Sequence, residues 1–196
     1  MSRNTSAKVP DGRRLRSERS RQAIIDAAIS LMDEGMLVAT AQQVADRADV
    51  GIRSLFRHFS DMESLYQAVD DQIRGDYEAL FLGGDRDGTV DERIQRMAER
   101  RAAAYEAVKT VVLATKAQLW RYEVLRKNYA RNQRGLRKDL ESWLPELLTD
   151  DPETQEAANA VASFEMWHRL REDQRLSRKR SIAVIVHMLT ALISES

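Results

Sequence analysis

The chain has 196 residues, of which 43% are hydrophobic and 32% charged, and its 31 basic and 31 acidic side chains cancel at neutral pH. This hydrophobic fraction excludes wholesale disorder, and the absence of cysteine excludes disulfides, thiol nucleophiles and cysteine-bound zinc. No run approaches the roughly 20 apolar residues of a membrane helix, and no apolar segment follows the basic N-terminus as in a secretory signal. We therefore expect a cytoplasmic protein without a membrane partner.

Basic residues cluster near the N-terminus, where residues 1–22 carry seven arginines and lysines against two acidic residues. Attraction to phosphate depends on such local clustering rather than on total charge. We predict a flexible basic arm over residues 1–16, although an ordinary solvated tail would have the same composition.

Helical periodicity predicts an all-α protein. A first helix is expected over 17–34, where Ile24, Ala28 and Leu31 share one face and Gly35 follows as a stop signal. Two short helices follow at 41–48 and 52–59, with Thr40 as N-cap of the first. A fourth helix begins with the capping-box pattern Ser60–Glu63.

Glycines at positions 83, 84 and 88 then predict a boundary between an N-terminal domain, 17–82, and a C-terminal domain, 83–196. Thr89 and Glu92 form a second capping box before a long helix or helix pair that extends to about Leu148. Pro152 suits the first turn of the next helix, whose apolar side continues to His168.

The last predicted helix, 177–194, is apolar around most of its circumference. Such a helix must bury more than one face, and in a chain of this size the simplest second surface is another subunit. Membrane association is a weaker alternative, because charges on both sides confine the apolar run to about a dozen residues.

The segment from Thr40 to Phe59 has the pattern of a helix-turn-helix. Val44, Ala45 and Leu55 are the apolar residues that two short helices need in order to pack across a tight turn. The outward positions of the second helix carry no acidic residue, so that helix can enter the major groove of DNA. These positions are Ile52, Arg53, Ser54, Phe56, Arg57 and His58.

The chain here resembles the tetracycline-repressor (TetR) family of transcriptional regulators. The resemblance covers Arg21–Gly35, the helix-turn-helix ending in Ser54-Leu-Phe-Arg-His-Phe59, and the segment Ser60–Leu65 that opens the connecting helix. It implies an N-terminal three-helix DNA-binding domain and a C-terminal helical bundle for dimerisation and ligand binding. The expected partners are palindromic double-stranded operator DNA, a second copy of the chain and a small-molecule effector that releases a repressor.

Three positions depart from the family pattern. Asp49 replaces the usual glycine of the turn, Gly51 replaces a serine or threonine cap, and Met62 replaces a lysine that contacts phosphate. Among the DNA contacts we assign Arg53 to base edges, and Phe56 by resemblance to the side of the DNA backbone. The residues assigned to phosphate are Thr40, Gln43, Arg57 and His58, and the full expected interface also includes Gly51, Ile52 and Ser54.

A ligand pocket is harder to locate from the sequence. Candidate lining residues are Met97, Arg101, Tyr105, Trp120, Phe164 and Trp167, although ordinary bundle core is the favoured interpretation for any one of them. Arg101 lies on an apolar stripe, so it must pair with an acidic residue or meet an anionic ligand. No metal or cofactor is expected.

The alternatives are an enzyme and a helical adaptor. The three histidines are far apart in sequence and belong to no metal or nucleophile motif, so we do not expect catalysis. An adaptor that lacks sequence-specific DNA binding would explain the apolar last helix but not the helix-turn-helix.

Overall fold

The computed structural model describes residues 12–149 and 151–194, and within them all regular structure is helical. The helices are α1 (Gly12–Asp33), α2 (Ala41–Arg47), α3 (Ile52–His58), α4 (Met62–Phe81), α5 (Val90–Gln118), α6 (Glu123–Trp143), α7 (Pro152–Val161), α8 (Phe164–His168) and α9 (Arg178–Ser194). A 3₁₀ turn at Pro145–Leu148 precedes α7, and a π turn at Arg169–Asp173 follows α8.

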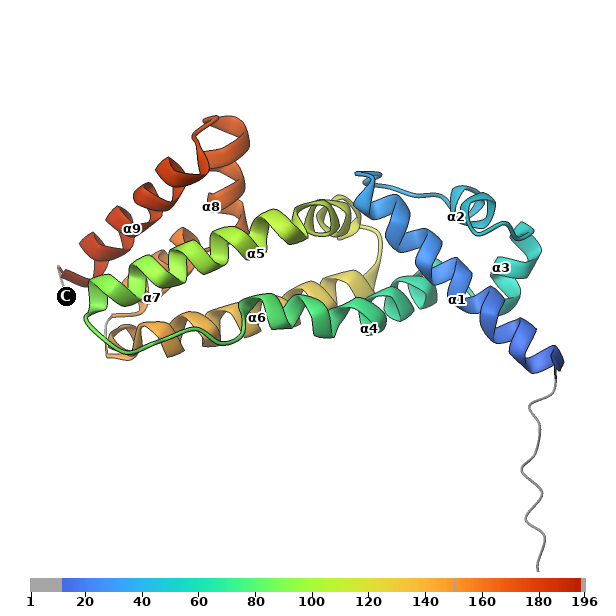
Figure 1. Ribbon diagram of the computed structural model, residues 1–196, viewed down its shortest axis with the longest axis horizontal. Coiled ribbons are helices and arrows are strands. Elements are labelled where there is room, and N and C mark those ends of the chain that lie inside the picture. The colour runs from blue at the N-terminus through green and yellow to red at the C-terminus, as the bar shows by residue number, and fades with distance from the viewer. Residues whose placement is uncertain (1–11, 150, 195–196) are drawn as a thin grey trace, which may run out of the picture.

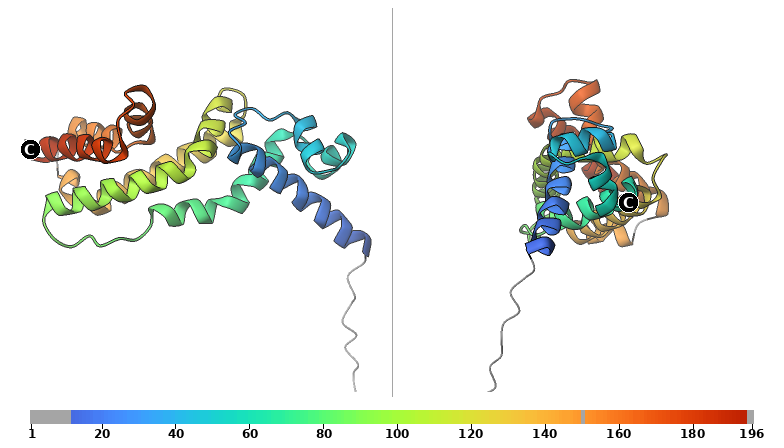
Figure 2. Two further views of the ribbon diagram at one scale, coloured as in Figure 1. Left: turned by 45° about the horizontal axis from the view of Figure 1, so that its top comes forward. Right: turned by 90° about the vertical axis from the view of Figure 1, so that its right-hand side faces the viewer.

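The molecule is elongated, as Figures 1 and 2 show, with α1–α3 at one end and α7–α9 toward the other. We call α1–α3 and the start of α4 the head, and α5–α9 with the rest of α4 the bundle. Helices α4, α5 and α6 run between the two ends, and α9 packs on α5. None of the described helices is long and apolar enough to span a membrane.

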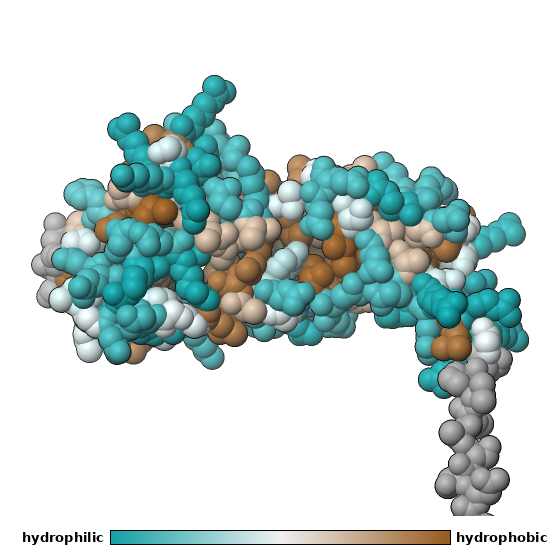
Figure 3. All heavy atoms as spheres, viewed as in Figure 1, coloured by the Kyte–Doolittle hydropathy of each residue, from teal (hydrophilic) through white to brown (hydrophobic). Residues whose placement is uncertain are grey.

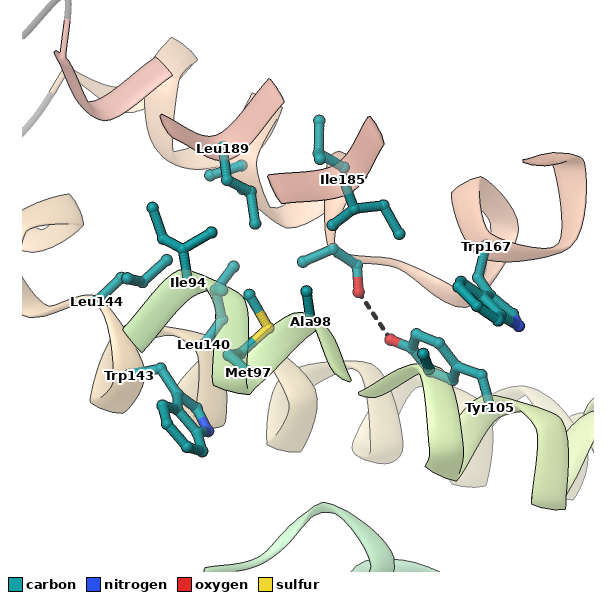
Figure 4. Packing of buried hydrophobic residues seen from close by; sticks show 14 of the residues in the cluster. Ile94, Met97, Ala98, Tyr105, Leu140, Trp143, Leu144, Trp167, Ile185 and Leu189 are labelled. Carbon is teal, nitrogen blue, oxygen red and sulfur yellow. Dashed lines mark hydrogen bonds between the residues drawn. The ribbon is translucent and has the colours of Figure 1, made fainter. Parts of the chain in front are cut away.

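Two apolar cores follow this division. The head core holds Ile24, Val44 and Leu55, and it also receives Val111 and Ala114 from the C-terminal part of α5. The bundle core, seen in Figure 4, gathers fully buried side chains from α5, α6 and α9 around Met97. Helix α5 therefore contributes to both cores.

The structure corrects several expected boundaries. Helix α1 begins at Gly12, so residues 12–16 of the expected arm are helical; residues 1–11 lie outside the described part of the chain. Arginine is a good helix former, and Arg14 pairs with Glu18 one turn later at 3.2 Å, which favours this extension.

The predicted Ser60–Glu63 capping box is wrong by one residue. Asp61 is the N-cap of α4, and its Oδ1 accepts a hydrogen bond from the backbone N–H of Ser64 at 2.8 Å. Glu63 is free for another role: its Oε1 accepts from the N–H of Val124 at the start of α6, at 3.0 Å. The Thr89–Glu92 box at the start of α5 is confirmed.

The apolar side expected to continue from Pro152 to His168 is divided between two helices. Helix α7 ends at Val161, and Ser163 caps a separate helix α8 through the N–H of Met166 at 3.2 Å. A serine side chain that competes for backbone hydrogen bonds is the physical reason for the break.

Two glycines provide a test of the packing. Gly84 has φ +95°, and a Cβ there would lie 2.7 Å from ring atoms of Trp143, whereas Gly75 lies in α4 with open space around it. We expect Gly84→Ala to lower the free energy of unfolding by about 1–3 kcal/mol and Gly75→Ala to raise it by up to about 1 kcal/mol. Urea unfolding measures both, and equal effects of the two substitutions would contradict this packing.

Candidate nucleic-acid interface and ligand cavity

The helix-turn-helix is held by a small apolar contact and one strained residue. Val44, Ala45 and Leu55 are at most 1% exposed, and the N–H of Val50 donates to the carbonyl of Ala45 at 3.0 Å across the turn. Asp49 has φ +52°, a left-handed backbone conformation; in the family pattern this position is usually glycine, which adopts it readily. The departure at this position therefore leaves the shape of the turn intact.

Helix α2 is tied to α1 by an arginine. Arg47 donates from Nη1 to Ser30 Oγ at 2.7 Å and from Nη2 to Glu34 Oε2 at 2.7 Å. The hydrogen bond from Arg47 lowers the pKa of the Glu34 carboxyl. This link orients α2, and through α2 the turn and α3.

Helix α3 presents a basic and aromatic face. Arg53, Phe56 and Arg57 are exposed, with 47% of Phe56 accessible, while Ile52, Ser54 and His58 are half-buried. Arg57 donates from Nη2 to Ser54 Oγ at 2.9 Å, which leaves its other N–H groups free for an anion. Gly51 is the N-cap of α3 and supplies no side-chain hydrogen bond.

Thr40 and Gln43 cap the start of α2. Thr40 Oγ1 accepts from the N–H of Gln43 at 3.2 Å, and Gln43 Oε1 accepts from the N–H of Thr40 at 2.9 Å. The Gln43 amide nitrogen takes no part in these bonds and can still donate outward. The cap therefore fixes both side chains at the start of α2.

His58 is the last residue of α3. Its Nε2 is buried without a hydrogen-bond partner among the described residues. Burial lowers the pKa of the imidazole below its ordinary value of 6.5, and the charges of Arg57 and Arg21 lower it further. Arg21 also lies over the Phe59 ring, 5.0 Å from its centroid, which brings this arginine of α1 close to the end of α3.

Three residues connect the head to the bundle. Tyr66 of α4 donates from its hydroxyl to Gln118 Oε1 at 2.8 Å, and Gln118 Nε2 donates to the carbonyl of Leu37, in the α1–α2 loop, at 3.3 Å. Glu63 joins α4 to α6, as described above. The sequence predicted neither link, because a glutamine at a helix end carries no distinctive pattern.

A cavity of about 370 Å³ lies between α4, α5 and α6, with Phe164 of α8 and Met32 of α1 also in its wall. Its lining is mainly apolar. Figure 3 shows apolar atoms gathered in a hollow in the middle of the molecule, between α5 and the α4–α6 pair. The volume falls within the range of small-molecule sites.

Only some of the expected pocket residues line this cavity. Tyr105 and Phe164 do, whereas Met97 and Trp167 are buried in the bundle core (Figure 4). Trp120 lies outside it, 80% exposed in the turn between α5 and α6. The residues expected to form one pocket therefore lie in three different places.

Arg101 is part of the bundle and not of the cavity wall. Its Nη2 pairs with Asp139 Oδ2 at 3.1 Å, and its Nη1 donates to the carbonyl of Ala162 at 3.0 Å. The same carbonyl accepts from the Tyr105 hydroxyl at 2.8 Å, the dashed line in Figure 4. Of the two alternatives that the sequence left open, an acidic partner is the one present.

Three polar residues of the cavity wall were not among the residues expected from the sequence. Arg131 of α6 donates from Nη2 to both carboxylate oxygens of Asp70 on α4, each at 2.9 Å. Its Nη1 donates to Asn128 Oδ1 at 3.1 Å. All three residues line the cavity, and they are close only because α4 and α6 pack together. The described residues hold no cluster suited to a metal ion.

Comparison with known proteins bears on this arrangement. Residues 24–69 match the family model "Bacterial regulatory proteins, tetR family". A tetR-family transcriptional regulator from Streptomyces coelicolor is 17% identical with a TM-score of 0.68, over 89% of this chain and 80% of its own. No curated protein sequence matches the chain.

Two similar structures contain small molecules. The multidrug binding protein EbrR, complexed with imidazole, is 21% identical with a TM-score of 0.59, over 95% of this chain and 97% of its own. SmeT, complexed with triclosan, is 14% identical with a TM-score of 0.57, over 88% and 90%.

The chain therefore contains a helix-turn-helix and shares its fold with these solved structures. Its residues 24–69, which include the helix-turn-helix, match the tetR family of bacterial regulatory proteins.

The shifted pKa of His58 predicts a pH dependence of stability. Because the folded protein disfavours the charged imidazole, the unfolded chain binds a proton first on acidification. The contribution of His58 is therefore fully present above pH 6.5 and is lost as the pH falls through the lower pKa of the folded state. We expect His58→Gln to flatten the decline between about pH 7 and 5 in urea unfolding. A decline of the same slope in His58→Gln and in the wild type would contradict this role of His58.

Proposed function

We propose that the protein is a dimeric repressor that binds a palindromic operator through α3 and is released by a small molecule. The observation that carries the DNA-binding part is the exposed face of α3, where Arg53 and Arg57 flank Phe56 and no acidic residue occurs. A helix with this surface, held at its N-terminal end by a tight turn, suits the major groove.

The roles of the two arginines differ by their place on α3. Arg53 is in the first turn, the end that faces base edges in a helix-turn-helix, and it suits a bidentate bond to guanine. Arg57 is in the last turn and is already oriented by Ser54, so we assign it to a phosphate. Thr40, Gln43 and His58 are proposed as further phosphate neighbours.

Selection of bound sequences from a random DNA pool, at stated salt, tests the DNA-binding proposal. We expect a palindrome whose half-sites are about one helical turn, roughly 34–36 Å, apart. If the folded dimer enriches no sequence, the proposal fails and the alternative of a helical adaptor is favoured.

Binding measurements on the selected operator then distinguish the roles of Arg53 and Arg57. Arg53→Ala should cost about 1–3 kcal/mol in binding and relax specificity at one base pair in each half-site. Arg57→Ala should weaken binding by a similar factor on every site variant and lower the salt slope by about one. Titration of operator variants at several salt concentrations measures both, and uniform weakening by Arg53→Ala would contradict its base-reading role.

The dimer is proposed to form through α9. Ser181, Ile185 and Leu189 face the bundle and are at most 5% exposed. On the other side Ala183, His187 and Ala191 recur every four residues, all exposed, beside half-buried Val184 and Met188. The two alanines of this row allow a second helix to approach closely on either side of His187, and the apolar neighbours favour burial of that face.

A charge on that face should separate the subunits. We expect Ala183→Arg or Ala191→Arg to give a monomer in analytical ultracentrifugation, because each would bury an unpaired charge at a symmetric contact. Loss of the dimer should also weaken operator binding, since the heads of both subunits must contact the DNA together. Ala160→Arg, at an exposed position of α7, is the control. A stable dimer in both α9 variants would contradict the interface.

The effector is proposed to bind in the cavity. Helix α4 supplies cavity residues and also carries Tyr66, which joins the head through Gln118. The small molecules bound to EbrR and SmeT support a ligand site in a protein of this fold. Release of DNA requires a ligand that binds one position of α4 better than the other. A ligand that occupies the cavity without changing operator affinity would contradict the coupling.

A further inference from the structure

One residue of the cavity wall carries a buried hydrogen-bond donor that has no partner in the described part of the chain. Asn128 is 8% exposed and lines the cavity, and its Nδ2 has no partner among the described residues. A buried amide N–H without an acceptor costs about 1–3 kcal/mol, so such a group calls for a specific explanation.

The orientation of this amide is fixed by its neighbour. Asn128 Oδ1 accepts from Arg131 Nη1 at 3.1 Å. If the amide were turned over, its nitrogen would face the guanidinium, and two donors would oppose each other. The Asn128 nitrogen is therefore held as the unpaired end of the amide, and Arg131 Nε is also buried without a partner in the described chain.

The partly buried carboxylates of the cavity wall are already compensated, and the remaining lining carboxylate, Glu78, is exposed to solvent. Asp70 receives Arg131, and Asp139 receives both Arg101 and Arg86, each at 3.1 Å. A cationic ligand would find these two carboxylates occupied. An anionic ligand would meet Arg131 with its charge offset by Asp70.

We propose that the cavity takes a neutral, largely apolar molecule with a carbonyl oxygen, such as a ketone, ester or amide, and that this oxygen accepts a hydrogen bond from Asn128 Nδ2. The inference rests on the proposed ligand response and specifies the chemistry of the effector. Apolar side chains such as Val69, Val108 and Val111 surround the rest of the molecule, and Asn128 determines its orientation.

Calorimetric titration of the full-length dimer with four probes on one naphthalene ring tests the proposal. The probes are 2-acetylnaphthalene, 2-ethylnaphthalene, 2-naphthoate and 2-naphthylmethylammonium. We expect the ketone to bind about tenfold more tightly than the hydrocarbon, the effect of one buried hydrogen bond. The side-chain amide signal of Asn128 in a ¹⁵N spectrum should move with the ketone and not with the hydrocarbon.

The matched variants are Asn128→Asp and Asn132→Asp. The first keeps the acceptor for Arg131, replaces the N–H donor with an oxygen and adds one negative charge, which Arg131 is placed to offset. It should abolish the preference for the ketone and leave hydrocarbon binding within about twofold. The second makes the same chemical change at an exposed residue on the cavity rim and should keep the preference. The missing amide signal in Asn128→Asp assigns that resonance.

Each other outcome overturns the proposal in a distinguishable way. Equal binding of ketone and hydrocarbon, or equal effects of the two variants, rejects the role of Asn128 while the cavity remains a ligand site. Tightest binding of the ammonium or carboxylate probe rejects the neutral class. No binding of any probe to the folded dimer rejects the cavity as a site for such ligands, and DNA binding is judged separately by the selected operator.

Discussion

The structure depends on the continuity of α5. This helix of 29 residues spans about 43 Å at 1.5 Å per residue, and it places Ile94 and Met97 in the bundle core and Val111 and Ala114 in the head core. Two cores that share one unbroken helix cannot shift independently unless that helix bends or tilts. Helix α4 makes a similar connection, with Leu65 in the head core and Tyr77 packed against both cores. Under the proposed ligand response, a molecule bound between α4 and α5 therefore changes the relative tilt of two helices that both reach into the head core.

The buried arginine at the middle of the bundle has a complementary role. Arg101 of α5 pairs with Asp139 of α6 and donates to the carbonyl of Ala162 at the C-terminal end of α7. Tyr105, also on α5, donates to the same carbonyl. Burial of a charge is costly unless it is paired and hydrogen-bonded, and here two carbonyls and a carboxylate satisfy most of the guanidinium. The network holds three helices in register, and it also compensates Asp139, whose charge would otherwise define the polarity of the cavity.

The sequence predicted the head better than the bundle, for a physical reason. The helix-turn-helix depends on residues within about 20 positions of each other, so periodicity at Val44, Ala45 and Leu55 and the tolerance of Asp49 for positive φ were sufficient. The cavity depends on contacts between distant segments: Arg131 and Asp70 are 61 positions apart, and neither belongs to a motif. Aromatic content was a poor guide, because Trp167 became core and Trp120 fell in a turn. From the sequence, the partner of Arg101 could be either an acidic residue or a ligand. The choice depends on the packing of α5 against α6, which places Asp139 beside Arg101.

The exposed position of Trp120 also gives the chain a built-in optical reporter. The protein has three tryptophans, and Trp143 and Trp167 are 1% and 3% exposed, so a water-soluble quencher reaches only the indole of Trp120. That indole is two positions beyond Gln118, which holds Tyr66 of α4 and the α1–α2 loop. Its emission can therefore be read selectively in the unlabelled protein, at the point where the head meets the bundle.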